Sequence, residues 1–131
     1  YCIPLTSPKA KFEKMKSQVD FIKIFDESKK GENTLIGVLN INNMIPVDES
    51  VIRKVDLTIH NNDKQEVKAH KRLMQKQLKW CREHVDTIEN RANKVYDMVV
   101  KKPDKNINLV KRSSKFSKLE VISDKLVTKK K

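Results

Sequence analysis

The chain has 131 residues, 37% of them hydrophobic and 35% charged, with two glycines, which suits one domain over residues 1–131 and excludes a fibrous or a disordered protein. Its net charge of +12 favours a polyanionic partner. No apolar run approaches the ~20 residues that a bilayer span needs, no signal peptide is recognisable, and Cys2 and Cys81 form neither a metal-binding nor a disulfide pattern, so we expect a cytoplasmic protein with reduced thiols.

The first half of the chain, residues 1–60, has the pattern of β-strands. A short strand is expected to end at Leu5. Two runs rich in Val, Ile and Phe, residues 18–26 and 34–42, flank a polar connection over residues 27–33 and predict an antiparallel pair. A further apolar run over residues 51–59 predicts an additional strand at a sheet edge.

The second half, residues 61–131, has the helical period. Asn61, Asn62 and Asp63 are typical of a helix start, because their side chains can cap free backbone N–H groups. One apolar stripe then extends along about thirty residues and predicts one long helix or two in tandem, with Asp86 as a possible cap of the second. The stripe consists of Val67, Met74, Leu78, Cys81, Val85, Ile88, Ala92, Val95 and Val99.

A last helix is predicted after Pro103, over roughly residues 114–126. Its apolar positions, expected to face inwards, are Phe116, Leu119, Ile122 and Leu126.

The charge, like the periodicity, differs between the two halves of the chain. Residues 1–60 hold nine basic and eight acidic residues, whereas residues 61–131 hold twenty basic and nine acidic residues. Nucleic acid is the commonest polyanion that such a field attracts; an anionic membrane surface and a merely lysine-rich solvated surface are the alternatives.

Most catalytic constellations are missing from the sequence. Two glycines cannot supply a phosphate-binding glycine loop. His60, His70 and His84 have no zinc-binding spacing and are interpreted as ordinary surface or half-buried histidines. The acidic residues are scattered among basic ones, which argues against a two-metal nuclease. Any catalysis is therefore expected to need neither a metal nor a cofactor.

One segment does carry chemistry, namely the residues that follow the first strand. Thr6 and Ser7 supply two hydroxyls, Pro8 fixes the backbone, and Lys9 supplies a cation. Such a loop can hold a phosphate while the lysine offsets charge that develops on its oxygens. The alternative is an ordinary turn.

Four motifs occur in an order that resembles a known family. They are PLTSPK at residues 4–9, DFIK at 20–23, LNINNMIPV at 39–47 and QLKW at 77–80. Together they resemble the endoribonuclease toxins of type III toxin–antitoxin systems, the ToxN and AbiQ group, over roughly residues 1–116. Four ordered motifs are far more specific than any one of them.

The resemblance implies an α+β fold, with a strongly twisted antiparallel sheet or partly open barrel similar to MazF and Kid and with packed helices. It implies metal-independent cleavage of single-stranded RNA by attack of a ribose 2′-hydroxyl, which leaves a 2′,3′-cyclic phosphate. Thr6, Ser7 and Lys9 match the family's catalytic loop: Ser7 is expected to position or transfer a proton, and Lys9 to stabilise the charged transition state.

The resemblance also implies an RNA partner, a small structured repeat RNA that acts as antitoxin, is processed by the toxin and is held as a pseudoknot in a closed protein–RNA assembly. Trp80 is expected to stack on a base or, alternatively, to anchor the core. The residues expected to bind RNA are Pro8, Lys11, Lys14, Lys16, Lys76, Gln77, Lys79, Trp80, Lys111, Arg112, Lys115 and Lys118.

The chain departs from the family pattern at two points. Family members carry an N-terminal segment ahead of the loop, and we expect that segment to be missing here. The loop has Thr6 where serine is common, which keeps the hydroxyl. A non-catalytic basic RNA-binding or ribosome-associated domain, in which the loop is only a turn, is the alternative function.

Overall fold

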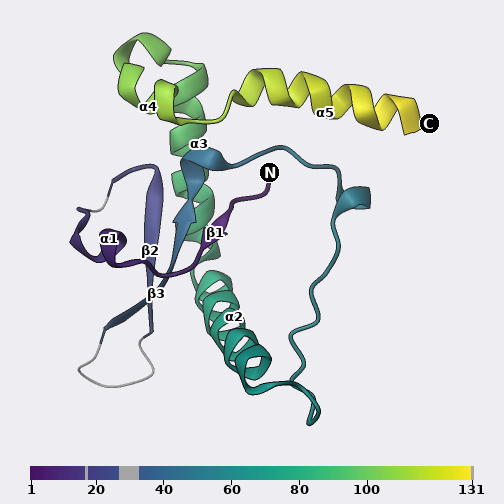
Figure 1. Ribbon diagram of the computed structural model, residues 1–131. Coiled ribbons are helices and arrows are strands. Elements are labelled where there is room, and N and C mark those ends of the chain that lie inside the picture. Colours follow the sequence, from purple (N-terminus) through teal and green to yellow (C-terminus); the bar gives the residue numbers. More distant parts are fainter. Residues whose placement is uncertain (17, 27–32, 131) are drawn as a thin grey trace.

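The computed structural model describes residues 1–16, 18–26 and 33–130 (Figure 1). The strands are β1 (Leu5–Thr6), β2 (Phe21–Asp26) and β3 (Thr34–Asn40), and they form an open antiparallel sheet in the order β1-β3-β2. The helices are α1 (Ala10–Lys14), α2 (Gln65–Glu83), α3 (Val85–Val100), α4 (Ile107–Arg112) and α5 (Phe116–Lys130). The predicted combination of helices with an antiparallel sheet is confirmed.

The predicted antiparallel pair is confirmed in β2 and β3. Phe21 lies opposite Asn40 and Lys23 lies opposite Val38, with an irregularity between Ile24 and Phe25. Most of the connection predicted between these strands, residues 27–32, lies outside the described residues. The predicted short first strand is also present as β1, which ends one residue later than expected.

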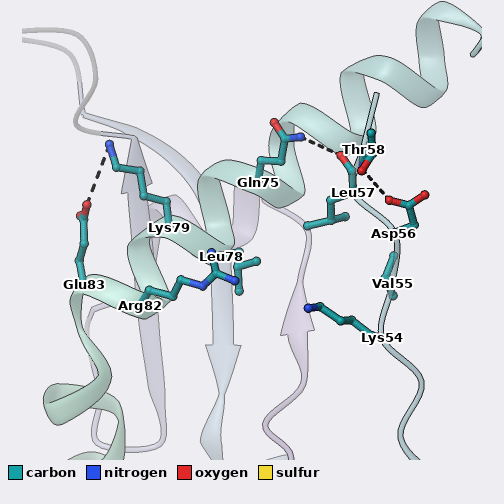
Figure 2. Close-up of a pocket in the computed structure, with 10 residues that line it drawn as sticks. All are labelled: Lys54, Val55, Asp56, Leu57, Thr58, Gln75, Leu78, Lys79, Arg82 and Glu83. Carbon is teal, nitrogen blue, oxygen red and sulfur yellow. Dashed lines mark hydrogen bonds and ion pairs between the residues drawn. The ribbon is translucent and has the colours of Figure 1, made fainter. Parts of the chain in front are cut away.

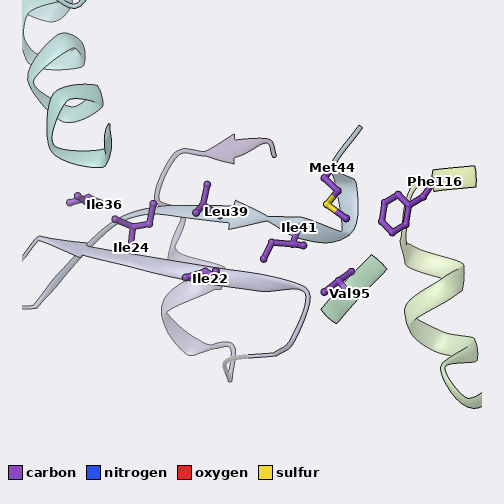
Figure 3. Packing of buried hydrophobic residues seen from close by; sticks show 8 residues of the cluster. All are labelled: Ile22, Ile24, Ile36, Leu39, Ile41, Met44, Val95 and Phe116. Carbon is purple, nitrogen blue, oxygen red and sulfur yellow. The ribbon is translucent and has the colours of Figure 1, made fainter. Parts of the chain in front are cut away.

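The sheet separates two apolar clusters, because successive side chains of a strand point to opposite faces. The larger cluster joins the sheet to α3 and α5 (Figure 3), and it consists of Ile22, Ile24, Ile36, Leu39, Ile41, Met44, Val95 and Phe116. The smaller cluster lies on the α1 side and consists of Phe12, Phe21, Leu35 and Val38. The sheet is therefore buried on both faces, which explains why its strands read as nearly continuous apolar runs.

The apolar stripe of the second half forms two helices in tandem, so that alternative is correct. α2 ends at Glu83 and α3 begins at Val85. At the break, His84 stacks on the ring of Trp80 with a centroid distance of 3.9 Å, and its backbone N–H donates to the carbonyl of Cys81. His84 itself occupies the N-cap position of α3 without a side-chain capping hydrogen bond, so the predicted cap at Asp86 is wrong.

The strand predicted over residues 51–59 is wrong. A single 3-10 turn, Glu49–Val51, is followed by extended backbone without a strand partner. The Asp48 and Asp56 carboxylates accept hydrogen bonds from the N–H groups of Ser50 and Thr58, so local side chains satisfy backbone groups that a sheet would otherwise pair. A prediction from apolar content alone therefore assigned one strand too many to the sheet.

The start of α2 and the orientation of α5 also differ from expectation. Asp63 accepts a hydrogen bond from the His60 backbone within a turn, and α2 begins only at Gln65, so the Asn-Asn-Asp motif precedes the helix without capping it. In α5, Phe116 is buried, but Ile122 and Leu126 are 46% and 57% exposed, so their predicted inward orientation is wrong. The reason is visible in Figure 1, where α5 extends away from the sheet beyond its start.

None of the described helices combines the length and the apolar character that crossing a bilayer requires.

Candidate functional site

The loop that follows β1 is held at both ends. Thr6 pairs with Val38 of β3, and the carbonyl of Lys9 accepts a hydrogen bond of 2.9 Å from the N–H of Phe12, the buried side chain of α1. Thr6 is half-buried, whereas Ser7 and Lys9 are exposed. The structure therefore brings the three predicted catalytic residues together at the end of β1 and on the short, anchored loop that follows it, with Ser7 and Lys9 facing solvent.

A residue that the sequence did not single out contacts this loop. Asn40, the last residue of β3, donates a hydrogen bond from Nδ2 to the hydroxyl oxygen of Thr6. Its backbone N–H donates to the carbonyl of Pro4 at 2.9 Å. The available signal was a polar residue that closes an otherwise apolar strand.

Lysines surround the loop. Lys9, Lys11, Lys14 and Lys16 are all exposed, and in the described part of the chain none of them forms an ion pair with a carboxylate. Lys11 lies over the ring of Phe12, 5.0 Å from its centroid. These cations are therefore available to an anionic ligand at the loop.

A second cationic feature is a groove of about 820 Å³ between α2 and the extended segment 54–58 (Figure 2). Lys54 and Arg82 point into it from opposite sides, with Leu78 between them. Lys79 lines the same groove and lies 3.9 Å from Glu83. Of these cations only Lys79 was predicted from the sequence. The signal for Lys54 was the basic pair at residues 53–54 in an otherwise nearly neutral half.

The outer wall of the groove is fastened to α2 by backbone acceptors. Gln75 donates to the carbonyl of Leu57 and Lys71 to that of Thr58, both at 2.7 Å. The Asp56 carboxylate is engaged with the backbone N–H of Thr58, which is the main reason that its pKa falls to about 2. Neither Lys54 nor Arg82 forms an ion pair within the described ranges. Because Lys54, Lys79 and Arg82 line the groove together with the carboxylates of Asp56 and Glu83, the groove has a small excess of positive charge.

The loop and the groove lie on different sides of the sheet. Thr6 pairs with Val38, which belongs to the cluster under α1, whereas Leu5 pairs with Leu39, which belongs to the cluster on the α3 side. Helix α2, which forms one wall of the groove, contacts the sheet on the Leu39 side through Trp80. A ligand that reached both features would have to pass around β1.

Two residues of α2 that were predicted to contact RNA make contacts inside the fold. Gln77 is 4% exposed and donates a 2.7 Å hydrogen bond to the carbonyl of Ile36, so its amide is occupied inside the fold. Trp80 packs against the larger cluster and stacks on His84, which favours the anchor interpretation. Lys76 remains half-exposed, in an ion pair of 2.8 Å with Asp26.

The predicted cations of the second half do not form one surface. Lys76 and Lys79 lie on α2, whereas Lys111, Lys115 and Lys118 are exposed around α4 and the start of α5, at the other end of α3 (Figure 1). The Arg112 guanidinium is bound to the buried Asp20 carboxylate, so this predicted RNA-binding cation already has a partner within the fold. The charge is therefore divided among separate regions. Within the described ranges, no three His, Cys, Asp or Glu residues cluster as a metal site would need.

Comparison with known proteins gives consistent matches. The family model described as toxin ToxN of type III toxin–antitoxin systems matches residues 1–124. A relative from Bacillus thuringiensis subsp. kurstaki, endoribonuclease ToxN, is 36% identical over 96 residues, which is 73% of this chain. The match spans only 44% of that relative's length.

Two solved structures have the same fold. One comes from work on bacterial type III toxin–antitoxin systems and on selective toxin inhibition by a non-coding RNA pseudoknot. Its TM-score is 0.72 at 30% sequence identity, and the match covers 95% of this chain and 70% of the chain in that structure. The other, AbiQ, a lactococcal anti-phage endoribonuclease of a type III system, has a TM-score of 0.73 at 27% identity, with 98% and 72% covered.

Proposed function

Because the chain belongs to the ToxN family of toxins from type III toxin–antitoxin systems, we propose that it is a sequence-specific, metal-independent endoribonuclease that cleaves single-stranded RNA. The ribose 2′-oxygen attacks the adjacent phosphorus while the bond from phosphorus to the 5′-oxygen breaks. The 2′-hydroxyl proton passes to a base, and the departing 5′-oxygen takes up a proton. The products are a 2′,3′-cyclic phosphate and a 5′-hydroxyl.

The observation that carries this proposal is the anchored end of β1 and the loop after it, where the half-buried Thr6 hydroxyl is followed by the exposed Ser7 and Lys9. Ser7 positions the reacting groups or transfers a proton, and Lys9 offsets the charge that builds up on the phosphate oxygens. Thr6 contributes a second hydroxyl. Hydroxyls and an ammonium group act on a phosphate directly, which is why the reaction is proposed to need no metal.

The RNA is proposed to contact both cationic features. Pro8 and the lysines at residues 11, 14 and 16 bind the nucleotides beside the scissile phosphate. Lys54, Lys79 and Arg82 hold the backbone of a more distant part of the strand in the groove against α2. Longer RNAs additionally reach the exposed lysines at residues 111, 115 and 118.

The inhibitor is proposed to be a repeat RNA antitoxin, which the toxin processes and then holds as a pseudoknot in a closed protein–RNA assembly. The similarity to a type III system described as toxin inhibition by an RNA pseudoknot supports this partner. A single domain over residues 1–131 and the likeness of the sheet to the MazF and Kid barrel remain predictions.

Expression in a bacterial host tests the function. The full-length protein should arrest growth, and the Ser7→Ala variant should relieve the arrest. Ser117→Ala, which removes the hydroxyl of an exposed serine on α5, is the matched control and should remain toxic. In vitro, the purified protein should cleave single-stranded RNA in the presence of a chelator and leave cyclic phosphate ends.

A protein that binds RNA without arresting growth or cleaving would instead be the non-catalytic RNA-binding domain. Ser7→Ala should also bind RNA with nearly unchanged affinity, because one neutral hydroxyl contributes little to a contact dominated by phosphate charge. A large loss of RNA affinity in Ser7→Ala would contradict its role in the chemical step.

A further inference from the structure

The side-chain amide of Asn40 is directed at the hydroxyl of the candidate active-site loop. Asn40 Nδ2 donates to the Thr6 hydroxyl oxygen, and the Asn40 backbone N–H donates to the Pro4 carbonyl. One bond reaches Thr6 of β1 and the other reaches Pro4 just before the strand, on either side of Leu5. The amide and the loop therefore keep their relative position without help from a ligand.

The position of Asn40 is itself determined by buried neighbours. Val38, two residues before it, and Ile41, directly after it, are fully buried. The N–H of Ile41 donates to the Asp20 carbonyl at 2.9 Å, and this connects the end of β3 to the start of β2. Asn40 and Val38 share a face of β3, and Thr6 pairs with Val38, so the amide approaches the hydroxyl diagonally across the two strands.

A hydroxyl has one hydrogen to donate and two lone pairs that accept. When the side-chain N–H of Asn40 donates to one lone pair of the Thr6 oxygen, the Thr6 hydroxyl hydrogen must point away from Asn40. We propose that Asn40 is a positioning residue, which holds Thr6 as an acceptor towards β3 and thereby directs the Thr6 hydrogen at a non-bridging oxygen of the scissile phosphate. This inference rests on the proposed function.

Asn40→Asp is the sharpest test, because the two side chains have nearly the same shape. A carboxylate cannot donate, so it would accept the Thr6 hydrogen and withdraw it from the phosphate. The donor acts mainly on charge that develops in the transition state, so kcat for RNA cleavage should fall, by about 10- to 100-fold, with KM nearly unchanged. Asn43→Asp is the matched control: it adds the same charge at an exposed position three residues later and should stay near wild type.

Combining variants separates positioning from a general disturbance. If Asn40 acts through the Thr6 hydroxyl, Asn40→Asp should cost little more once Thr6→Val has removed that hydroxyl, so the two effects should not add. Additive effects, or a wild-type kcat in Asn40→Asp, would overturn the inference. If Asn40→Asp does not fold, the same comparison of single and double variants is made with Asn40→Ala and Thr6→Val, and additive effects would again overturn the inference.

The failure of this inference differs from the failure of the proposed function. If the wild-type protein cleaves RNA and Ser7→Ala does not, but Asn40→Asp cleaves normally, only the role of Asn40 is wrong. If the wild-type protein does not cleave RNA, the endoribonuclease itself is wrong, and the role of Asn40 falls with it.

Discussion

Arg112 and Asp20 form a two-pronged ion pair across 92 residues of sequence, with Nε at 2.8 Å from Oδ2 and Nη2 at 2.9 Å from Oδ1. The Asp20 side chain is only 6% exposed, and its hydrogen bonds raise the pKa of the guanidinium further above its ordinary value. The Asp20 carbonyl accepts the N–H groups of Ile41 and Asn42. The pair therefore fastens α4 to the junction of β2 and β3.

Replacing Arg112 with Met should destabilise the protein. The substitution leaves the buried Asp20 carboxylate without its cation, a loss of about 2–3 kcal/mol after allowance for the partial exposure of Arg112. Urea unfolding followed by Trp80 fluorescence measures the change. Lys111→Met, at the neighbouring exposed position, is the control and should stay within about 0.5 kcal/mol of wild type.

Gly37→Ala should also destabilise the protein, for steric reasons. A Cβ at Gly37 would lie 3.0 Å from Nε2 of Gln77, and 3.3 Å from both the Leu5 side chain and the Thr6 carbonyl. Overpacking of this kind costs about 1–3 kcal/mol.

The neighbour of Gly37 provides an internal check. Gln77→Ala removes the crowding side chain but leaves the buried carbonyl of Ile36 without its donor, and should by itself cost about 1–3 kcal/mol. The free energies of unfolding of the single and double variants should not add, because Gly37→Ala costs less when Gln77 is short. Simple additivity would show that the two side chains do not compete for space.

The groove against α2 should contribute to the salt dependence of RNA binding. Each lysine or arginine that neutralises a phosphate of single-stranded RNA contributes about 0.7 to the slope of log K against log salt concentration. The double variant Lys54→Ala/Arg82→Ala should therefore lower the slope by roughly 1.4, measured by fluorescence anisotropy with a long single-stranded RNA.

The matched control for the groove is Lys94→Ala with Lys125→Ala, which removes the same charge from exposed positions of α3 and α5. It should lower the slope less than the groove pair does. An equal change in both double variants would mean that RNA responds to the total charge and not to the groove.

The segment that forms the outer wall of the groove should loosen in acid. Backbone hydrogen bonds lower the pKa of Asp56 from 3.8 to about 2 and lower that of Asp63 as well. A lowered folded-state pKa means that the carboxylate stabilises the fold above its unfolded value of 3.8 and that this contribution is lost as pH falls through about 2.

The amide proton of Thr58 reports this directly in an NMR titration, since it donates to Asp56. Its chemical shift should change with a midpoint near pH 2, and Asp56→Asn should abolish the change. A midpoint near 3.8 would mean that the carboxylate and the amide are not bonded.

Local sequence patterns predicted the strands and helices whose apolar residues recur with the period of the element. The pairing of β2 with β3 follows from two β-rich runs, and the tandem helices follow from one apolar stripe. The prediction failed at residues 51–59, where apolar residues occur without a strand partner and aspartate side chains bind the backbone instead. It also failed at Ile122 and Leu126, which were expected to face inwards but are exposed, because α5 extends away from the sheet.

By itself, the sequence determined the hydroxyl-bearing loop, the excess of positive charge and the order of the motifs, because these depend on residue type and spacing alone. Only the tertiary structure decided which cations are free. Arg112 is bound by a carboxylate 92 residues away, whereas Lys54 and Arg82 point into a groove from opposite sides. Such pairings depend on distances between segments far apart in the chain, and a one-dimensional charge pattern does not contain them.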